Sequence, residues 1–214
     1  MKQNKTYIVA VTGGIATGKS TAINYIKLRG YKVIDFDEIS HEVLNNKIVI
    51  NELVNAFGKS ILENEKINRK KLGSYVFSDK VKLETLNTIT HNRIYNKASK
   101  QIQENEKENI LFLDIPLLYE TKVKFEEFYK MVDEVWVISS NPRVQATRLM
   151  IRDKINIDIA NKKIKSQMNL RLKERLGNVI FYNNSDIYAL YEDLRIELFN
   201  LEKRVKGLYE KKEL

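Results

Sequence analysis

The sequence predicts an α/β fold in which a five-stranded parallel sheet is flanked by helices and carries an inserted helical subdomain and a lid. Short apolar runs alternate with helical stretches, which is typical of a parallel sheet with helices on both faces. A glycine-rich loop directly follows the first run, and a long segment separates the second run from the third. The strand-like runs are residues 8–12, 32–34, 110–113, 135–139 and 179–182.

The glycine-rich loop, residues 13–20, reads GGIATGKS and fits the phosphate-binding pattern G-x-x-x-x-G-K-[ST]. The apolar run 7–11 before it predicts a buried strand, and Ala22, Ile23 and Ile26 after it have helical spacing. Strand, loop and helix therefore occur in the order that such a site requires. The loop predicts binding of a nucleoside triphosphate, and the alternative is a glycine turn before a basic helix.

Each fixed position in the loop has a chemical reason. Glycines let backbone N–H groups approach phosphate oxygens closely. Lys19 is expected to reach the β- and γ-phosphates, and the Ser20 hydroxyl to ligate Mg²⁺. The expected nucleotide contacts are Gly13, Gly14, Ala16, Thr17, Gly18, Lys19, Ser20 and Thr21.

Two acids, Asp35 and Asp37, follow the second run, at the sheet edge where ligands bind in open α/β folds. If the segment is extended, alternation points both acids the same way. One carboxylate would then accept the proton of an attacking hydroxyl, and another could hold Mg²⁺ directly or through water. The alternative is helix capping, with Asp37 as the N-cap of a helix beginning near Glu38.

The third run ends at Asp114, in the place of a Walker-B-type aspartate, and Pro116 follows it. We expect Asp114 to influence Mg²⁺ or the loop hydroxyl. The alternative is an acid that only closes the strand.

The segment 38–109 is too long for one crossover helix and predicts an inserted helical subdomain, with a long helix from about Asp79 to Glu106. Beside a phosphate-binding loop it is interpreted as the platform for an acceptor substrate, the alternative being a purely structural cover. His91 lies in one of these helical stretches. A lone histidine is more often structural, and without cysteine it does not support a zinc site.

Arg148 and Arg152 lie four residues apart in a helix that begins at Pro142, so they share a face and could reach phosphates together. The basic stretch that follows is expected of a lid over the nucleotide, at about residues 148–168. The alternative is an ordinary solvated basic helix. Residues 186–214 predict a closing helix, whose expected apolar stripe is Ile187, Leu190, Leu194, Leu198 and Leu201.

The chain has 214 residues, which suits a single domain, and a net charge of +9. Lysines are interleaved with acids rather than gathered in a stripe, so no nucleic-acid partner is expected. The absence of cysteine, of a signal-like apolar start and of any run near the roughly 20 residues of a membrane span predicts a cytoplasmic protein that binds no membrane. A monomer is the favoured expectation.

At this point several motifs resemble the dephospho-coenzyme A kinase family over most of the chain. They are residues 11–21 with their double glycine, the 33–37 segment VIDFD, and the 116–120 segment PLLYE. Further matches are Phe57-Gly58 with Ile61-Leu62, Ile67-Asn68-Arg69 with Leu72, Arg148 with Arg152, Gln167, and Asn183. Several motifs in the right order are more specific than one loop.

The resemblance implies a P-loop kinase core and transfer of the ATP γ-phosphoryl, with Mg²⁺, to the ribose 3′-hydroxyl of dephospho-coenzyme A. Carried onto matching positions, Asp37 would be the catalytic base, Arg148 a contact of the transferred phosphate with Arg152 beside it, and Lys19 the loop lysine. The candidate acceptor contacts are Asp35, Arg69, His91, Pro116 and Leu117.

The chain departs from the family pattern in three places. Asn92 stands where the family usually has proline, Glu65 where it has glycine, and Gly177-Asn178 where it has Ala-Asp. Two alternatives stay open: another small-molecule or nucleoside kinase, or a nucleotide-dependent switch or nucleic-acid-binding protein. Against the last, the chain has no Asn-Lys-x-Asp tetrad for guanine and no concentrated basic face.

Overall fold

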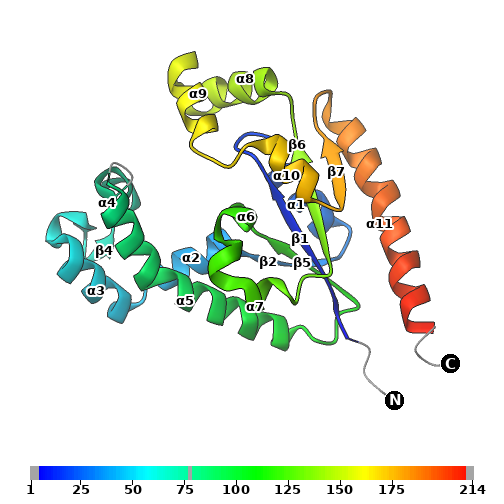
Figure 1. Cartoon of the computed structure of the whole chain (residues 1–214), viewed down its shortest axis with the longest axis horizontal. Coiled ribbons are helices and arrows are strands. Elements are labelled where there is room, and N and C mark those ends of the chain that lie inside the picture. The colour runs from blue at the N-terminus through cyan, green and yellow to red at the C-terminus, as the bar shows by residue number, and fades with distance from the viewer. Residues whose placement is uncertain (1–4, 77–78, 211–214) are drawn as a thin grey trace. The chain divides into compact units, whose positions relative to one another are not determined.

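The structure, a computed structural model, describes residues 5–76 and 79–210 and divides into two compact units, residues 1–34 with 104–214, and residues 35–103 (Figure 1). In chain order the elements are β1 (Tyr7–Gly13), α1 (Lys19–Leu28), β2 (Lys32–Asp35), α2 (Phe36–Leu44), α3 (Lys47–Phe57), η1 (Lys59–Ile61), β3 (Leu62–Glu63), β4 (Lys66–Ile67), α4 (Arg69–Val76), α5 (Lys80–Glu104), β5 (Ile110–Asp114), α6 (Leu118–Thr121), η2 (Lys122–Phe125), α7 (Glu126–Tyr129), β6 (Glu134–Ser139), α8 (Pro142–Asp153), α9 (Ile157–Lys165), α10 (Leu170–Leu176), β7 (Val179–Tyr182) and α11 (Ile187–Glu210).

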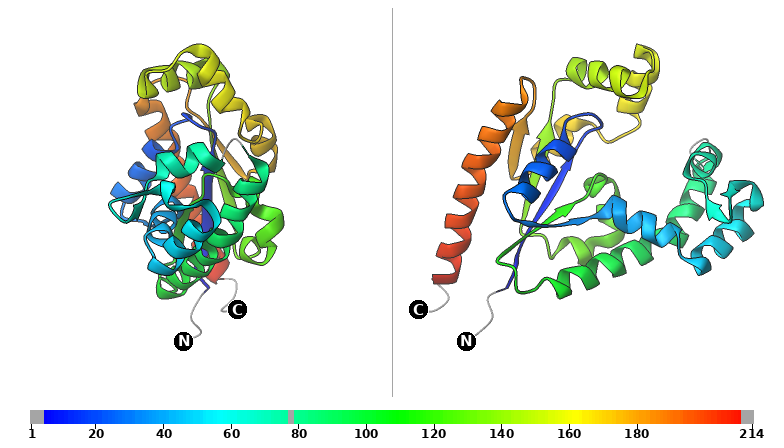
Figure 2. Two further views of the ribbon diagram at one scale, coloured as in Figure 1. Left: turned by 90° about the vertical axis from the view of Figure 1, so that its left-hand side faces the viewer. Right: turned by 180° about the vertical axis from the view of Figure 1, so that it is seen from behind.

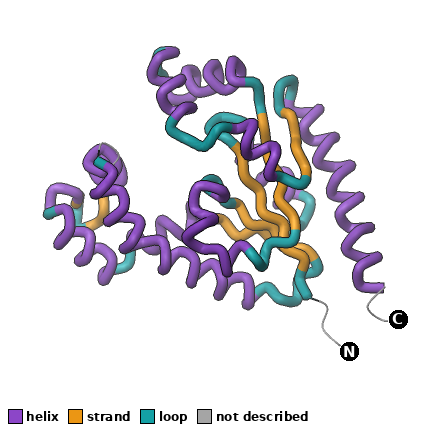
Figure 3. Tube along the Cα trace, viewed as in Figure 1, coloured by secondary structure: helices purple, strands orange, loops and turns teal. Residues whose placement is uncertain are grey.

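The first unit is built on the predicted five-stranded sheet, in the order β2-β5-β1-β6-β7, and this prediction is confirmed (Figure 3). The central strand β1 pairs in parallel with β5 and β6, with Val11 opposite Asp114 and Gly13 opposite Ile138. Because parallel strands end at the same edge, this register gathers the loop after β1 with the segments that follow β5 and β6.

One face of the sheet is covered by α1 and α11, which Figure 2 shows from behind. Trp136 and Phe112 are fully buried there, with their rings 5.2 Å apart in an edge-to-face arrangement. The stripe predicted along α11 is buried at its four leucines and extends to Val205, but Ile187 is 43% exposed. That part of the prediction is wrong because Ile187 is the first residue of the helix, beyond the end of the core.

At the start of β6, Glu134 is only 7% exposed and is held by three donors. Trp136 Nε1 donates at 2.8 Å, Arg204 Nη2 at 2.9 Å and the Tyr7 hydroxyl at 3.1 Å. Burial, and then the neighbouring Glu134 carboxylate, raise the pKa of Tyr7 to about 12. The Glu134 carboxylate therefore connects α11 with the first residue of β1. This contact lies at the opposite end of the strands from the glycine loop.

On the opposite face, α10 packs against β6, and the turn after it explains one departure from the family pattern. Asn178 donates its backbone N–H to the Val135 carbonyl, and its side-chain oxygen accepts the Val135 N–H, both at 2.8 Å. An amide oxygen accepts as an aspartate oxygen would, so Asn178 keeps the bond that starts β7 beside β6.

The second unit contains α2, α3, α4 and most of α5, whose bounds agree with the predicted long helix. It also contains an antiparallel pair, β3 and β4, that the sequence analysis missed because each strand has two residues (Figure 3). Asn64 and Glu65 form the turn between them with φ of 49° and 60°. The backbone at Glu65 is left-handed, a conformation that strains most residues but not glycine. This explains why the family pattern has glycine at this position.

The segment after β2 differs from the prediction. The strand ends at Asp35 and α2 begins at Phe36, so Asp37 lies in the first helical turn rather than in an extended segment. Asp35 is the N-cap, because its Oδ1 accepts the backbone N–H of Asp37 at 2.9 Å and of Glu38 at 3.1 Å. The expectation of alternating side chains, and of Asp37 as the cap, is therefore wrong.

We predict that Gly177→Ala destabilises the protein. An added Cβ would lie 2.5 Å from Val137 Cγ2, which is in the buried core. Overpacking costs about 1 to 3 kcal/mol and outweighs the gain of about 0.4 to 1 kcal/mol from a less flexible unfolded chain. Urea unfolding should show the loss. Gly207→Ala in α11 is the control, because nothing lies within 4 Å of its Cβ and alanine favours the helix; equal effects of the two changes would contradict the prediction.

Candidate active site

Hydrogen bonds within the loop between β1 and α1 fix its conformation. Thr17 donates both its backbone N–H, at 3.3 Å, and its hydroxyl, at 2.9 Å, to the Gly14 carbonyl. Gly18 precedes α1 with a φ of 96°, and Ala16 has a φ of 59°. Left-handed residues turn successive N–H groups toward one side, and the start of a helix of ten residues adds its unpaired N–H groups.

The glycines of the loop are also required by the protein around them. A Cβ on Gly13 would lie 2.5 Å from the Ile138 carbonyl oxygen, and one on Gly18 would lie 2.1 Å from the Asn183 side-chain nitrogen. From the sequence, only the close approach of phosphate accounts for these glycines. The structure adds that β6 and the end of β7 leave no room for a side chain.

Side chains from distant elements hold the outer side of the loop. Gln145 Nε2 donates to the Ile15 carbonyl at 2.8 Å, and the Ile15 N–H donates to Gln167 Oε1 at 2.7 Å. Asn183 Nδ2 donates to the Thr17 carbonyl at 2.8 Å. Gln167 and Asn183 carried the family resemblance, whereas Gln145 was missed; its one sequence signal is that it precedes Arg148 by three residues on the same helix face.

Lys19 begins α1, and its ammonium forms an ion pair with Asp114 at the end of β5. Asp114 is 6% exposed, so the pair lies largely away from solvent. This pairing of Asp114 with the lysine was not expected from the sequence, and Ser20 is exposed in the first turn of α1. The expected action of Asp114 on Mg²⁺ or on the loop hydroxyl stays a prediction.

The two arginines of α8 have different surroundings. Arg148 lies at the loop, donating from Nη1 to the Asn183 carbonyl at 3.1 Å and to the Thr17 carbonyl at 3.5 Å. Arg152 instead pairs with Asp153 through Nε at 2.8 Å, and Lys163 of α9 contacts the same carboxylate at 2.6 Å. Hydrogen bonds from Arg152 and then Lys163 hold the pKa of Asp153 well below its usual range.

Apolar contacts also connect α8 and α9 with the loop. Ala146, Leu149 and Ala160 form a small buried cluster, and the side chains of Ile15 and Ala16 pack against it. Two of the four positions that the G-x-x-x-x-G-K-[ST] pattern leaves open therefore pack against these helices.

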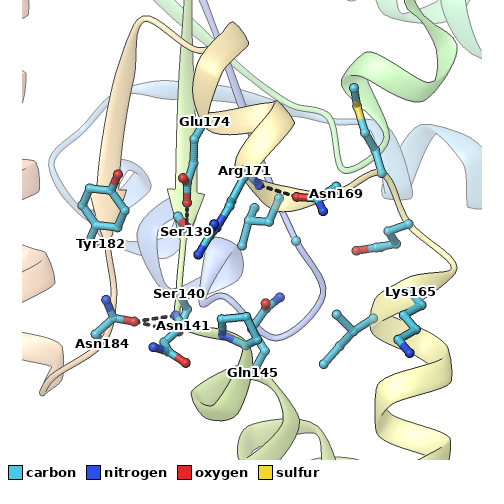
Figure 4. Close-up of a pocket in the computed structure, with 16 residues that line it drawn as sticks. Ser139, Ser140, Asn141, Gln145, Lys165, Asn169, Arg171, Glu174, Tyr182 and Asn184 are labelled. Atoms are coloured by element: carbon cyan, nitrogen blue, oxygen red, sulfur yellow. Dashed lines mark hydrogen bonds between the residues drawn. The ribbon is translucent and has the colours of Figure 1, made fainter.

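A cavity of about 690 Å³ borders the loop at Gly14, between α10 and the end of β6 (Figure 4). Most of the residues that line it have polar side chains. Glu174 accepts from the Ser139 hydroxyl, and the Asn184 side-chain oxygen accepts the Asn141 N–H at 2.6 Å. Arg171 extends from α10 into this space.

The remaining predicted residues are spread over both units. Pro116 accepts the Thr12 hydroxyl at 3.2 Å and Leu117 caps α6, both in the first unit. The second unit holds Asp37, exposed in α2, and Arg69, exposed at the start of α4. It also holds His91 of α5, whose ring lies edge-to-face with Tyr95 at 6.5 Å.

The parallel sheet and the phosphate-binding loop at its edge define a P-loop nucleotide-binding protein. The model of the dephospho-CoA kinase family matches residues 7–189. The chain belongs to this family.

Individual relatives agree with this assignment. A dephospho-CoA kinase of Fusobacterium nucleatum is 38% identical over 90% of this chain and 96% of its own length. Another, from Carboxydothermus hydrogenoformans, is 37% identical over 87% and 90%. The solved structure of a dephospho-CoA kinase from Campylobacter jejuni is 28% identical with a TM-score of 0.59, over 94% of this chain and 97% of that one.

We predict that Gly18→Ala abolishes nucleotide binding. Alanine at a left-handed φ costs about 1 to 2 kcal/mol, and its Cβ would also displace Asn183 from the Thr17 carbonyl. Gly30→Ala is a matched control, because Gly30 has a φ of 90° but nothing within 4 Å of its Cβ. Titration with ATP, carried out below both unfolding transitions, should show lost binding only for Gly18→Ala, which should also have the lower unfolding midpoint because of its contact with Asn183. Normal ATP binding by Gly18→Ala would contradict the prediction.

Proposed function

We propose that this chain transfers the γ-phosphoryl group of ATP to the ribose 3′-hydroxyl of dephospho-coenzyme A, which gives coenzyme A and ADP. The observation that carries the proposal is the family match over residues 7–189, in a chain whose glycine loop has the conformation of a phosphate site. The reaction is the final step of coenzyme A synthesis.

On the nucleotide side, Lys19 would exchange Asp114 for the phosphates. The proposed nucleotide contacts are Gly13, Gly14, Ala16, Thr17, Gly18, Lys19, Ser20 and Thr21. Arg148 already lies at the loop, where it can stabilise charge on the transferred group. The Arg152 side chain is exposed in its ion pair with Asp153, so it can leave that pair when the proposed lid, residues 148–168, closes.

Ser20 is the residue that would hold Mg²⁺. Its exposed hydroxyl lies next to Lys19 at the start of α1, and it offers the hard oxygen ligand that Mg²⁺ prefers. Mg²⁺ commonly binds kinases through one or two protein oxygens, phosphate oxygens and water. When bound, the ion neutralises phosphate charge. Residues 5–76 and 79–210 contain no group of three His, Cys, Asp or Glu residues placed to hold a metal.

On the acceptor side, we assign Asp37 as the base that accepts the hydroxyl proton. Its carboxylate is exposed in the first turn of α2, directly after the end of β2, and Asp35 fixes the backbone there by capping the helix. The insertion 38–109 would bind the acceptor. The proposed contacts are Asp35, Arg69, His91, Pro116 and Leu117.

The proposal includes a cytoplasmic location, which the lack of cysteine supports. Across the described residues, every helix is too short or too polar to cross a membrane.

We predict that purified protein with Mg·ATP phosphorylates dephospho-coenzyme A in a panel that also contains adenosine, other nucleosides, shikimate and RNA. Mass spectrometry should show the gain of one phosphate on dephospho-coenzyme A, with ADP formed in equal amount. Lys19→Ala protein is the negative control, because it lacks the loop ammonium. Phosphate on another acceptor and none on dephospho-coenzyme A would overturn the proposal.

We predict that Asp37→Asn lowers turnover by about 10²-fold or more with little change in ATP affinity, since a positioned base contributes to the chemical step and not to nucleotide binding. Steady-state rates and an ATP titration test both parts. Glu38→Gln is the matched control, a neutralised exposed acid in the same helical turn. Asp37 loses this role if its variant turns over like the control.

A further inference from the structure

Lys173 of α10 is fully buried, with an exposed fraction of 0%. A buried ammonium is costly unless each of its three N–H groups finds an acceptor. Here it contacts Glu120 Oε1 at 2.8 Å, the Gly13 carbonyl at 3.2 Å and the Pro116 carbonyl at 3.3 Å. The charge is therefore satisfied by three different parts of the protein.

Two of these acceptors lie in segments that form the candidate active site, the phosphate-binding loop and the segment after β5. Gly13 is the first residue of the phosphate-binding loop. Pro116 follows β5, whose last residue, Asp114, pairs with the loop lysine, Lys19. By bonding both carbonyls, Lys173 joins the beginning of the loop to the segment that holds Asp114.

The third acceptor connects this point with the lid. Besides Lys173, Glu120 accepts the backbone N–H of Met168 at 3.2 Å, at the end of the proposed lid. The neighbouring Gln167 bonds the Ile15 N–H of the loop. One short segment, residues 167–173, therefore contacts the loop at two places and Glu120 at two places.

We infer that Lys173 is a positioning residue for phosphoryl transfer: its ammonium sets the start of the phosphate-binding loop against the 114–120 segment and, through Glu120, against the end of the lid. Lys173 is buried and touches no substrate itself. Buried ion pairs are often no more stabilising than apolar residues of similar size, so stability alone does not explain a charge at this position. The effect on turnover rests on the proposed function, whereas the effect on ATP affinity does not.

The test uses Lys173→Met, which keeps the length of the side chain without donors, and the double variant Lys173→Met/Glu120→Gln. The single variant leaves the partly exposed Glu120 carboxylate without its cation, and leaves the Gly13 and Pro116 carbonyls without their donor, so it should unfold at lower temperature. The double variant should recover part of that loss, because glutamine is neutral and still accepts the Met168 N–H. ATP affinity, measured by direct titration, and turnover should stay at least about 10-fold low in both, because the Gly13 and Pro116 carbonyls lack their donor.

Arg204→Met is the matched control for a purely structural role. It removes the guanidinium from buried Glu134 at the other end of the sheet. It should lower the unfolding temperature while ATP affinity and turnover, measured below the transition, stay unchanged. Normal ATP affinity in the double variant, or an equal loss in Arg204→Met, would overturn the inference. If no acceptor in the panel gains phosphate, the proposed function fails, and the ATP titration still tests Lys173.

Discussion

The conformation of the phosphate-binding loop depends on where its carbonyl oxygens find donors. In a peptide unit the C=O and N–H groups point in opposite directions, so N–H groups can converge on a phosphate only if the carbonyls are bonded on the outer side. In this protein the Gly13, Gly14, Ile15 and Thr17 carbonyls all have such donors. The side chain of Thr17 supplies one of them, and the others come from α8, α10 and the end of β7.

The order of the strands in the first unit allows these donors to reach the loop. The sheet order places β6 directly beside β1 and β7 beyond it, so the segments that follow β6 and β7 reach the loop from one side. The same closeness explains why Gly13 and Gly18 admit no Cβ. The apolar contacts of Ile15 with α8 and α9 add a second link, through which movement of those helices would reach the loop.

Charge in the site is arranged in pairs of unequal accessibility. Under the proposed function, the phosphates of ATP would replace the carboxylate in two of these pairs, Lys19 with Asp114 and Arg152 with Asp153. Lys173, in contrast, is fully buried where it pairs with Glu120, so its ammonium is not open to a ligand. The two cations proposed to bind phosphate thus differ in their surroundings from Lys173, which holds the backbone, although all three are ordinary basic residues in the sequence.

Local patterns in the sequence determined the loop, the five strands and the long helices, because apolar periodicity and glycine spacing act between near neighbours. They also indicated the kinase family. Tertiary structure alone decided that Asp35 caps α2, that Asp114 pairs with Lys19, and that Lys173 supports the loop. The last contact joins residues 160 positions apart, and nothing in the residues around Lys173 distinguishes it from a solvated lysine. Burial by the packed sheet and helices makes that difference, because it removes water and leaves the protein's own acceptors as partners.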